Sequence, residues 1–305
     1  MELRKLVHTD RKQLAEICKK AIPSNYYVTE EALEQKLFHH PCFYEDASFS
    51  LWEDDECLGF IGIKLPGCEE LFPAMAWLSI LVVREDMQRK GYGSLLLEKA
   101  QAALKEIGIK EWIVGQDFAC FFSGLPEVTE ALCGFFQKHA FDVSEDFVYY
   151  DLEGNVQENP LMEDFVAESF EPYYKVCTYN KEEAELLSFL QQEFPGRWKY
   201  EVETALRRGK SHEEITLLWD TQDKEIVGFC MLSKEPDGRG KLGPIGISEK
   251  VRGKGLGEYF LCKSLFQLKR LGRDRVNIDW TVLTKFYAKF GFLPERTYCS
   301  AYKNI

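Results

Sequence analysis

Two glycine-rich segments of the sequence, Gln88–Gly93 and Arg252–Gly257, have the residue types of an anion-binding turn. Glycine lets backbone N–H groups point to one side without a Cβ clash, and a helix that starts after the turn adds partial positive charge. Arginine and lysine side chains add fixed charge. We therefore expect both turns to bind a phosphate or pyrophosphate. The residues predicted to contact it are Gln88, Arg89, Lys90, Gly91 and Gly93 in the first turn and Arg252, Gly253, Lys254, Gly255, Leu256 and Gly257 in the second.

The elements that must position the two turns are repeated as well. Apolar runs predict strands before the turns, at Leu78–Val83 and Gly243–Ser248, and helical patterns follow at Ser94–Ile107 and Glu258–Leu271. The glycines of the two turns, and the glycine that follows each helical pattern, are 164 residues apart. The chain therefore contains two copies of a strand–turn–helix unit.

The length and the charge distribution indicate two domains. With 305 residues, of which 45% are hydrophobic, we place the domains at residues 1–152 and 173–305, joined by an acidic linker at 153–172. These three segments carry net charges of −11, −6 and +5, so the second domain is the better match for a polyanionic ligand. The overall net charge of −12 argues against a nucleic-acid partner.

The sequence also predicts the compartment. No apolar run approaches the roughly 20 residues that span a membrane, and the charged N-terminal residues lack the apolar stretch of a signal peptide. Ten cysteines form no C-x-x-C pair, which favours small buried side chains in a reducing environment over disulfides or metal ligands. We expect a cytoplasmic protein with no membrane partner.

The histidines do not suggest a metal site. The five histidines show no pairing along the sequence, so no metal ion is expected. His39 and His40 are interpreted as a loop pair, with a place for His40 at a domain interface as the alternative. The segment before them predicts a helix at Thr29–Phe38 with Thr29 as its N-cap, and Asp10 is the predicted N-cap of an earlier helix at Arg11–Lys20.

The turns and a second motif together resemble a known family. The pattern Gln/Arg-x-x-Gly-x-Gly between a strand and a helix is similar to the acyl-CoA site of GCN5-related N-acetyltransferases (GNAT). It differs from the Rossmann G-x-G-x-x-G and lacks the Gly-Lys-Ser/Thr of a P-loop. Phe286–Phe292, read as FYAKFGF, looks like the F-Y-x-K-x-G-F signature of the family, and Phe135–Phe141 holds this place in the first copy. The resemblance covers nearly the whole chain, as two tandem domains.

The resemblance implies a fold and a ligand. The fold class is α/β (α+β), with two tandem domains that each contain a twisted mixed sheet, splayed central parallel strands and flanking helices. The co-substrate is acetyl-CoA, with its pyrophosphate on the amides of Arg252–Gly257. Phe286 belongs to the same site, and the pantetheine arm pairs with the backbone near Ile245, Gly246 and Ile247. An amine then attacks the acyl carbonyl directly.

Two residues are candidates for the chemistry itself. The leaving thiolate needs a proton, and Tyr287 matches the tyrosine that supplies it in this family. Phe136 stands at that place in the first copy and cannot donate a proton, so we expect a catalytic second domain and a degenerate first one. The strand before each turn lacks a carboxylate base. Asp279 is the nearest candidate, as a base, as a contact for a cationic substrate or as a structural acceptor.

The predicted function is acetyl transfer to a primary amine of a small molecule. The alternatives are a non-catalytic acyl-CoA-binding or regulatory module, and acetylation of a peptide, a protein or an aminoglycoside-type amine. The segment Phe194–Tyr200 either forms a wall of the acceptor site or packs in the core. Acyl length stays open, as does the choice between monomer and homodimer.

Overall fold

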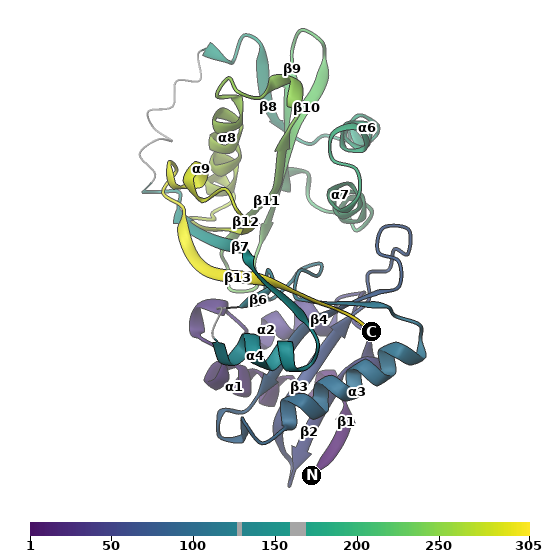
Figure 1. The fold of residues 1–305 in the computed structure, drawn as a ribbon. Coiled ribbons are helices and arrows are strands. Elements are labelled where there is room, and N and C mark those ends of the chain that lie inside the picture. The colour runs from purple at the N-terminus through teal and green to yellow at the C-terminus, as the bar shows by residue number, and fades with distance from the viewer. Residues whose placement is uncertain (127–129, 159–168) are drawn as a thin grey trace. The chain divides into compact units, whose positions relative to one another are not determined.

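The computed structural model describes residues 1–126, 130–158 and 169–305. The described chain divides into two compact units, each with its own strands and helices (Figure 1). Unit 1 comprises Met1–Tyr150 together with Glu295–Ile305, and unit 2 comprises Asp151–Pro294. Each unit contains one of the two predicted turns.

Unit 1 is built on a mixed sheet with the strand order β1-β2-β3-β4-β5-β13. Strands β4 and β5 are parallel, and the other neighbouring pairs are antiparallel. Its elements are β1 (Glu2–Lys5), α1 (Arg11–Ala21), α2 (Glu30–Leu33), β2 (Phe49–Glu53), β3 (Glu56–Lys64), β4 (Met75–Val83), α3 (Tyr92–Glu106), β5 (Glu111–Val114), β6 (Leu125–Pro126), α4 (Glu130–Lys138), β7 (Asp142–Asn155) and β13 (Leu293–Asn304).

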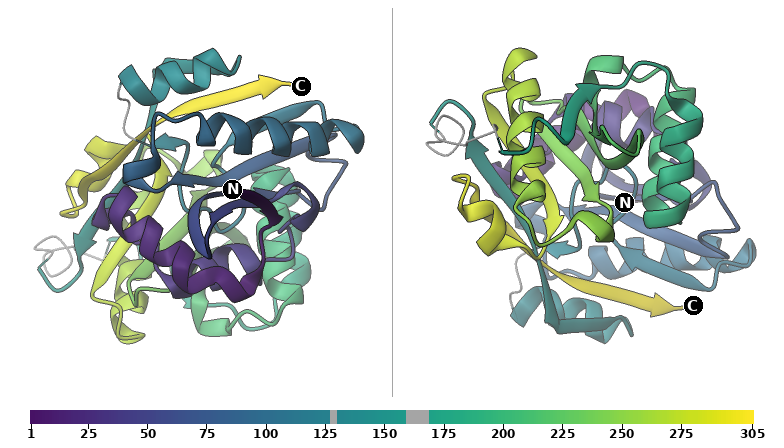
Figure 2. Two further views of the ribbon diagram at one scale, coloured as in Figure 1. Left: turned by 90° about the horizontal axis from the view of Figure 1, so that it is seen from below. Right: turned by 90° about the horizontal axis from the view of Figure 1, so that it is seen from above.

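Helices cover both faces of the unit 1 sheet, as the left view of Figure 2 shows for α1 and α3. The buried side chains of α3 are Leu96, Leu97, Ala100 and Leu104, the spacing of one helix face, and they share a core with α4. Helices α1 and α2 form a second core with Phe60, Ile80 and Val82 on the other face. The sheet is therefore held rigidly between two apolar layers.

Unit 2 repeats this order with β8 to β12. The right view of Figure 2 shows α8 on one face of its sheet and α6 and α7 on the other. Its elements are β8 (Tyr174–Thr178), α6 (Glu183–Glu193), α7 (Arg197–Arg207), β9 (Ile215–Asp220), β10 (Glu225–Lys234), β11 (Gly240–Ile247), α8 (Leu256–Arg270), β12 (Arg275–Thr281) and α9 (Thr284–Ala288).

The central parallel strands separate in both units, which confirms the predicted splayed sheet. In unit 1, β4 pairs with β5 only over Met75–Leu78 and then continues alone on that side to Val83. In unit 2, β11 pairs with β12 only at Gly240 and Lys241. Beyond the last paired residues, Leu78 of β4 and Lys241 of β11, the backbone N–H and C=O groups on that edge form no hydrogen bonds with the parallel neighbour among the described residues.

The unit boundaries differ from the predicted domains at two places. Residues Glu295–Ile305 group with unit 1, because Tyr302, Lys303 and Asn304 pair with β5. The first residues of the predicted linker, 153–155, belong to strand β7. Its central part, residues 159–168, lies outside the described residues.

None of the helices in the described ranges combines the length and the apolar character that a membrane crossing requires.

Candidate functional site

The two glycine-rich turns have the same backbone shape. Gly91 and Gly255 have φ of 89° and 81°, and two positions earlier Arg89 and Gly253 have φ of 63° and 80°. In each turn, two residues with left-handed backbone conformation are separated by one other residue. This arrangement points neighbouring backbone N–H groups to the same side and forms a hollow that attracts anions. Helices α3 and α8 start within the last two residues of the turns, after Gly91 and Gly255, and neither N-cap residue provides a side-chain hydrogen bond to the helix start. Both helix starts therefore keep donors for a ligand.

The first residue of each turn ties the turn to its strand. Gln88 Nε2 donates to Val83 O at 3.2 Å. At the equivalent place in unit 2, Arg252 Nε and Nη2 donate to Ile247 O at 3.3 and 3.2 Å. Gln88 and Arg252 thus each connect the turn to the preceding strand by a side-chain hydrogen bond. The sequence had suggested Arg252 only as a source of positive charge. Lys90 and Lys254, the predicted cations at the third position, are exposed.

A cavity of about 980 Å³ lies in unit 1 against the first turn. Its wall includes the end of β4 beyond the point of strand separation, and helix α4 faces the turn across it. A Cβ at Gly93 would lie 3.4 Å from the Phe135 ring and 3.7 Å from Val83, which both line the cavity. Gly93 therefore lies on the cavity wall, where a Cβ would make ordinary contacts with both side chains.

The lining of the cavity combines charged and apolar groups. Charged and amide side chains come from the turn and from α4, Ser94 comes from the start of α3, and the segment after α1 contributes apolar groups together with Tyr26. The polar lining residues are Gln88, Arg89, Ser94, Glu130 and Lys138. The apolar part includes Ile22, Pro23, Phe122, Pro126 and Phe136. Such a lining fits an elongated ligand that has a charged portion and an apolar portion.

Tyr26 is a lining residue of this cavity, and its hydroxyl oxygen is buried. The residue is 6% exposed, and its ring packs at 5.6 Å from Phe122 and edge-on at 6.1 Å from Tyr298. Phe136, which holds the place of Tyr287 in the sequence repeat, lines the same cavity without a polar atom. The sequence analysis missed Tyr26, because it lies in a short 3₁₀ turn (Ser24–Tyr26) without a motif.

His139, which follows α4, connects the end of α4 to the first turn of α3 beside the cavity. Ser94 Oγ and His139 Nε2 lie 2.8 Å apart, and the His139 ring rests 4.9 Å from that of Phe135. Burial is the main cause that lowers the pKa of His139, so the neutral ring is favoured. The sequence showed no pairing of the histidines, and this contact of His139 with Ser94 depends on the fold.

In unit 2, Tyr287 lies on α9 and is buried, with 5% of its surface exposed. Burial raises the pKa of its hydroxyl, and the neighbouring Cys230 thiol adds to the effect. The hydroxyl therefore stays protonated at neutral pH and is able to donate a proton. Phe286 packs edge-on against this ring at 5.1 Å.

Asp279 forms an ion pair across the separating strands of unit 2. Its Oδ2 lies 2.5 Å from Lys241 Nζ, and both side chains are about one-fifth exposed, at 21%. Lys241 is the last residue of β11 in register with β12. Among the three roles considered from the sequence, this contact fits a structural acceptor best, and catalysis by Asp279 stays a prediction.

The strand edge predicted to bind pantetheine is flanked by aromatic side chains. Ile245, Gly246 and Ile247 pair with β10 on one side and extend past the end of pairing with β12 on the other. A Cβ at Gly246 would lie 2.5 Å from the Phe194 ring, which packs at 5.1 Å from Trp198. For Phe194, the core-packing alternative is correct.

An aromatic residue also approaches the second turn. Phe170 would lie 3.5 Å from a Cβ at Gly255, and it stacks on Tyr259 of α8 at 5.3 Å. At Gly91 in the first turn, by contrast, no described atom lies within 4 Å of a Cβ. The first turn is therefore the more open of the two toward a bound anion.

Comparison with known proteins agrees with this architecture. The model of a family described as "Acetyltransferase (GNAT) family" matches residues 13–122 and 183–292. Among curated protein sequences, none matches the chain.

Solved structures match over almost the whole chain. A glucosamine N-acetyltransferase region of a fungal multi-domain β-N-acetylglucosaminidase has a TM-score of 0.86 at 17% identity; the match covers 99% of this chain but 38% of that one. A GCN5-related N-acetyltransferase from Sphaerobacter thermophilus has a TM-score of 0.77 at 14% identity, covering 99% and 95% of the two chains. A tandem GNAT protein from the clavulanic acid pathway reaches 0.70 at 13% identity, covering 99% and 98%. At these identities the likeness concerns the fold.

Proposed function

The chain belongs to the acetyltransferase (GNAT) family, with one copy of the family fold in each unit, and from this we propose that it is an acyl-CoA-dependent N-acyltransferase whose donor binds in the unit 1 cavity. The observation that carries the proposal is the cavity between the free edge of β4, the first turn and α4. The proposed donor site is therefore in unit 1, although the first domain was predicted from the sequence to be degenerate.

The lining suggests how an acyl-CoA donor binds. The pyrophosphate lies at the uncapped N–H groups after Gly91, where Arg89 and Lys138 supply positive charge. The pantetheine arm follows the free edge of β4 over Leu81–Val83, where its amides find backbone partners. The acyl end then lies in the apolar part of the cavity. Acetyl is the proposed acyl group.

The chemistry needs few groups. The lone pair of the acceptor amine attacks the thioester carbonyl carbon, the C–S bond breaks, and the sulfur leaves as a thiolate. We assign protonation of this thiolate to the hydroxyl of Tyr26, because Tyr26 is a lining residue of the cavity, where Phe136 has no proton to give, and Tyr26 then regains a proton from water. The proton lost from the amine nitrogen leaves through water, since the strand before the turn, Leu78–Val83, has no carboxylate.

Unit 2 is the second candidate for the same reaction. Its supporting observation is Tyr287, a buried hydroxyl with a raised pKa in the FYAKFGF motif. Phe170 beside Gly255 is the observation against it, because the ring lies near the predicted pyrophosphate position. The earlier prediction of a catalytic second domain therefore stays open as the rival.

We propose a small molecule with a primary amine as the acceptor. Most amines are cationic at neutral pH, and the net charge of −11 on residues 1–152 attracts cations. The fungal relative acts on glucosamine according to its description, so amino sugars come first in a screen. Aminoglycosides, a peptide N-terminus and the non-catalytic module follow as alternatives.

Calorimetric titration with acetyl-CoA tests the proposal. Gly93→Gln puts a long side chain on the wall of the unit 1 cavity, and Gly257→Gln is the matched change 164 residues later. A Cβ makes an ordinary contact at both positions, at 3.4 and 3.5 Å. We expect one site in the wild type, lost in Gly93→Gln and retained in Gly257→Gln. The reverse pattern selects unit 2. If neither unit binds acetyl-CoA, the proposed function is wrong.

Turnover separates an enzyme from a binding module. Release of free CoA is followed with each amine in turn, and the acetylated product is identified by mass. Binding without CoA release across the whole panel would favour the non-catalytic alternative.

A further inference from the structure

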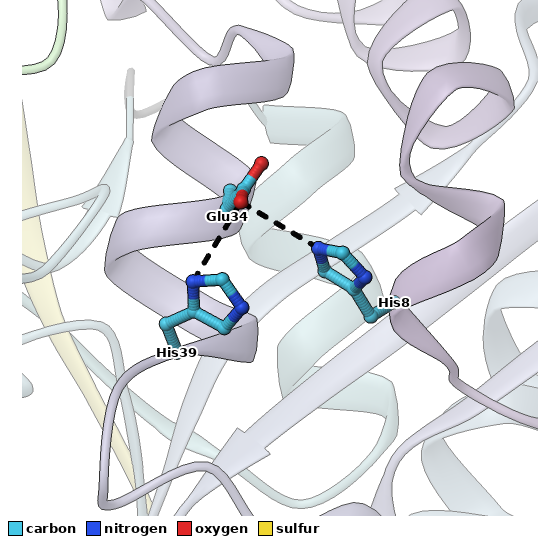
Figure 3. A group of neighbouring side chains, drawn as sticks. All are labelled: His8, Glu34 and His39. Carbon is cyan, nitrogen blue, oxygen red and sulfur yellow. Dashed lines mark ion pairs between the residues drawn. The ribbon is translucent and has the colours of Figure 1, made fainter.

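Two histidines and a glutamate from separate segments of unit 1 point toward one another, as Figure 3 shows. His8 Nε2 and His39 Nδ1 each lie 3.7 Å from the same oxygen, Glu34 Oε1. One atom from each of the three side chains lies within 4.8 Å of the other two. The sequence showed no pairing of these histidines and predicted no metal ion, and the folded chain brings two of them to one carboxylate.

An unusual helix turn brings Glu34 and His39 together. The predicted helix Thr29–Phe38 starts as expected, with Thr29 Oγ1 accepting from Ala32 N, but from Glu34 to Phe38 it is a π-helix. His39 N donates to Glu34 O at 2.9 Å, which is an i to i+5 bond. That bond places residues five apart on one face of the turn, whereas an α-helix aligns residues three or four apart. Short π segments occur frequently at functional sites.

The surrounding residues hold the three groups in position. Arg11 Nε lies 3.4 Å from Glu34 Oε2, so one carboxylate oxygen faces the arginine and the other faces both histidines. The His8 ring stacks on that of His39 at 5.1 Å and meets Phe38 edge-on at 5.6 Å. His8 Nε2 is buried and accepts or donates no hydrogen bond among the described residues. A buried ring nitrogen that faces a carboxylate without a hydrogen bond lacks a partner that a cation would supply.

We propose that His8, Glu34 and His39 form a binding site for a first-row transition metal ion, with Zn²⁺ as the first choice. Two imidazole nitrogens and one carboxylate oxygen are a common protein ligand set for such ions. In a tetrahedral zinc site with bonds of 2.0–2.2 Å, ligand atoms lie about 3.4 Å apart. The two distances of 3.7 Å are close to this value, so small side-chain rotations bring the atoms to an ion.

The remaining coordination position belongs to water. His8 Nε2 itself is buried, but the side chains of His8, Glu34 and His39 are 40%, 36% and 61% exposed, so water has access to the group from the side of Glu34 and His39. Arg11 orients Glu34 in the manner of the outer residues that fix metal ligands, but its positive charge opposes the ion. We therefore expect an affinity below that of a four-ligand structural zinc site.

The ion acts as a clamp between two helices. His8 precedes α1, and Glu34 and His39 follow α2, so a bound ion joins the two elements that flank residues 22–29. This connecting segment contributes Ile22, Pro23 and Tyr26 to the cavity wall. Metal binding is thus expected to stabilise unit 1 whether or not the proposed reaction occurs there.

Titration of the full-length, chelator-treated protein with Zn²⁺ tests the site. We expect one saturable site by calorimetry, weakened more than about tenfold in His8→Ala, His39→Ala and Glu34→Gln. His40→Ala is the matched control, because its side chain is next in sequence but outside the group, and it should leave the affinity unchanged. Circular dichroism before titration shows that each variant is folded.

Co²⁺ distinguishes this site from the free cysteines. Substitution with Co²⁺ should give a visible ligand-field spectrum without the thiolate-to-cobalt charge-transfer band that a cysteine site produces. The wild-type protein should also melt at a higher temperature with Zn²⁺, and His39→Ala should not. Binding that persists in all three variants, a thiolate band, or the lack of a saturable site would each overturn the proposal.

Discussion

At the scale of single residues, the Tyr26 hydroxyl is the sharpest difference between the two possible active sites. Tyr26→Phe removes one oxygen and keeps the ring contacts with Phe122 and Tyr298. If Tyr26 protonates the leaving thiolate, kcat should fall about 100-fold while acetyl-CoA binding changes little. The measurement is steady-state turnover beside calorimetry.

Tyr287→Phe is the matched control in unit 2. It removes the hydroxyl that the sequence motif singles out, and turnover should be unaffected if unit 1 does the chemistry. A large loss in Tyr287→Phe together with a normal rate in Tyr26→Phe would assign catalysis to unit 2.

Arg89 occupies a backbone conformation that suits glycine. Its φ is 63°, and the repeat has Gly253 at the same place. The left-handed backbone conformation destabilises the folded state by about 1–2 kcal/mol at a residue that has a side chain, and glycine removes this strain. Glycine also loses more conformational entropy on folding, which offsets about 0.5–1 kcal/mol of the gain. Arg89→Gly should therefore leave the free energy of unfolding unchanged or raise it by up to about 1 kcal/mol in chemical denaturation. Gly253→Ala should lower it by about 1 kcal/mol, and a strongly destabilised Arg89→Gly would contradict this explanation.

At the scale of elements, His139 joins the end of α4 to the start of α3 through Ser94. Its folded-state pKa is lowered from 6.5, so its contribution to stability is present above that value and is lost as the pH falls through the folded pKa. The melting temperature of the wild type should exceed that of His139→Gln near pH 7.5, and the difference should shrink as the pH falls below about 6.5. A difference that is constant with pH would show that His139 does not titrate in this way.

A buried ion pair holds the segment after β5. Lys64 Nζ at the end of β3 lies 2.5 Å from Asp117 Oδ1 and 3.0 Å from Phe118 O, and neither charged side chain is exposed. Lys64→Met removes the cation that faces the buried Asp117 carboxylate, so it should lower the free energy of unfolding by about 3–5 kcal/mol. The double variant with Asp117→Leu should recover part of this loss in denaturant titrations. Additive losses would show that the two charges are not coupled.

The strand–turn–helix units were predictable because glycine spacing and apolar periodicity are local signals. Other local signals failed: Asp10, the predicted cap of α1, has helical φ and ψ because a 3₁₀ turn, His8–Asp10, runs directly into the helix. The π-helix at Glu34–Phe38 was not predictable, since the spacing of its apolar residues also fits an α-helix. The group with His8 depends on contacts that only the folded chain creates.

The choice between the two sites could not be made from the sequence for a similar reason. Ile22-Pro23 and Phe194-Pro195 hold the same place in the two halves, and Tyr26 corresponds to Trp198. In unit 1 these residues line a cavity, whereas in unit 2 Phe194 and Trp198 pack against Phe229. Whether these side chains line a cavity or fill it depends on tertiary packing, which the sequence does not show. The net charge of residues 173–305 had favoured the second domain.

At the scale of the whole molecule, the end of the chain completes unit 1. Tyr298, Cys299 and Ala301 of β13 are fully buried, and β13 pairs with β5. Arg296 Nη1 donates to Asn25 O at 2.6 Å, and Tyr298 packs against Tyr26. The last strand therefore packs against Tyr26, a lining residue of the cavity, and a fragment that ends at residue 152 lacks an internal part of its own sheet.

A chain that ends at Pro294 should thus lose order in unit 1 more than in unit 2. Hydrogen exchange should become faster in β4 and β5, while β9 and β10 keep their protection, because their pairing lies within unit 2. Acetyl-CoA binding should be lost with the shortened chain if the unit 1 cavity is the donor site. Addition of a peptide with the sequence of Glu295–Ile305 should restore part of the protection, since the strand pairs through its backbone. Uniformly faster exchange in both units would instead mean that the two units unfold together, and unchanged exchange in β5 would show that the sheet of unit 1 is stable without its last strand.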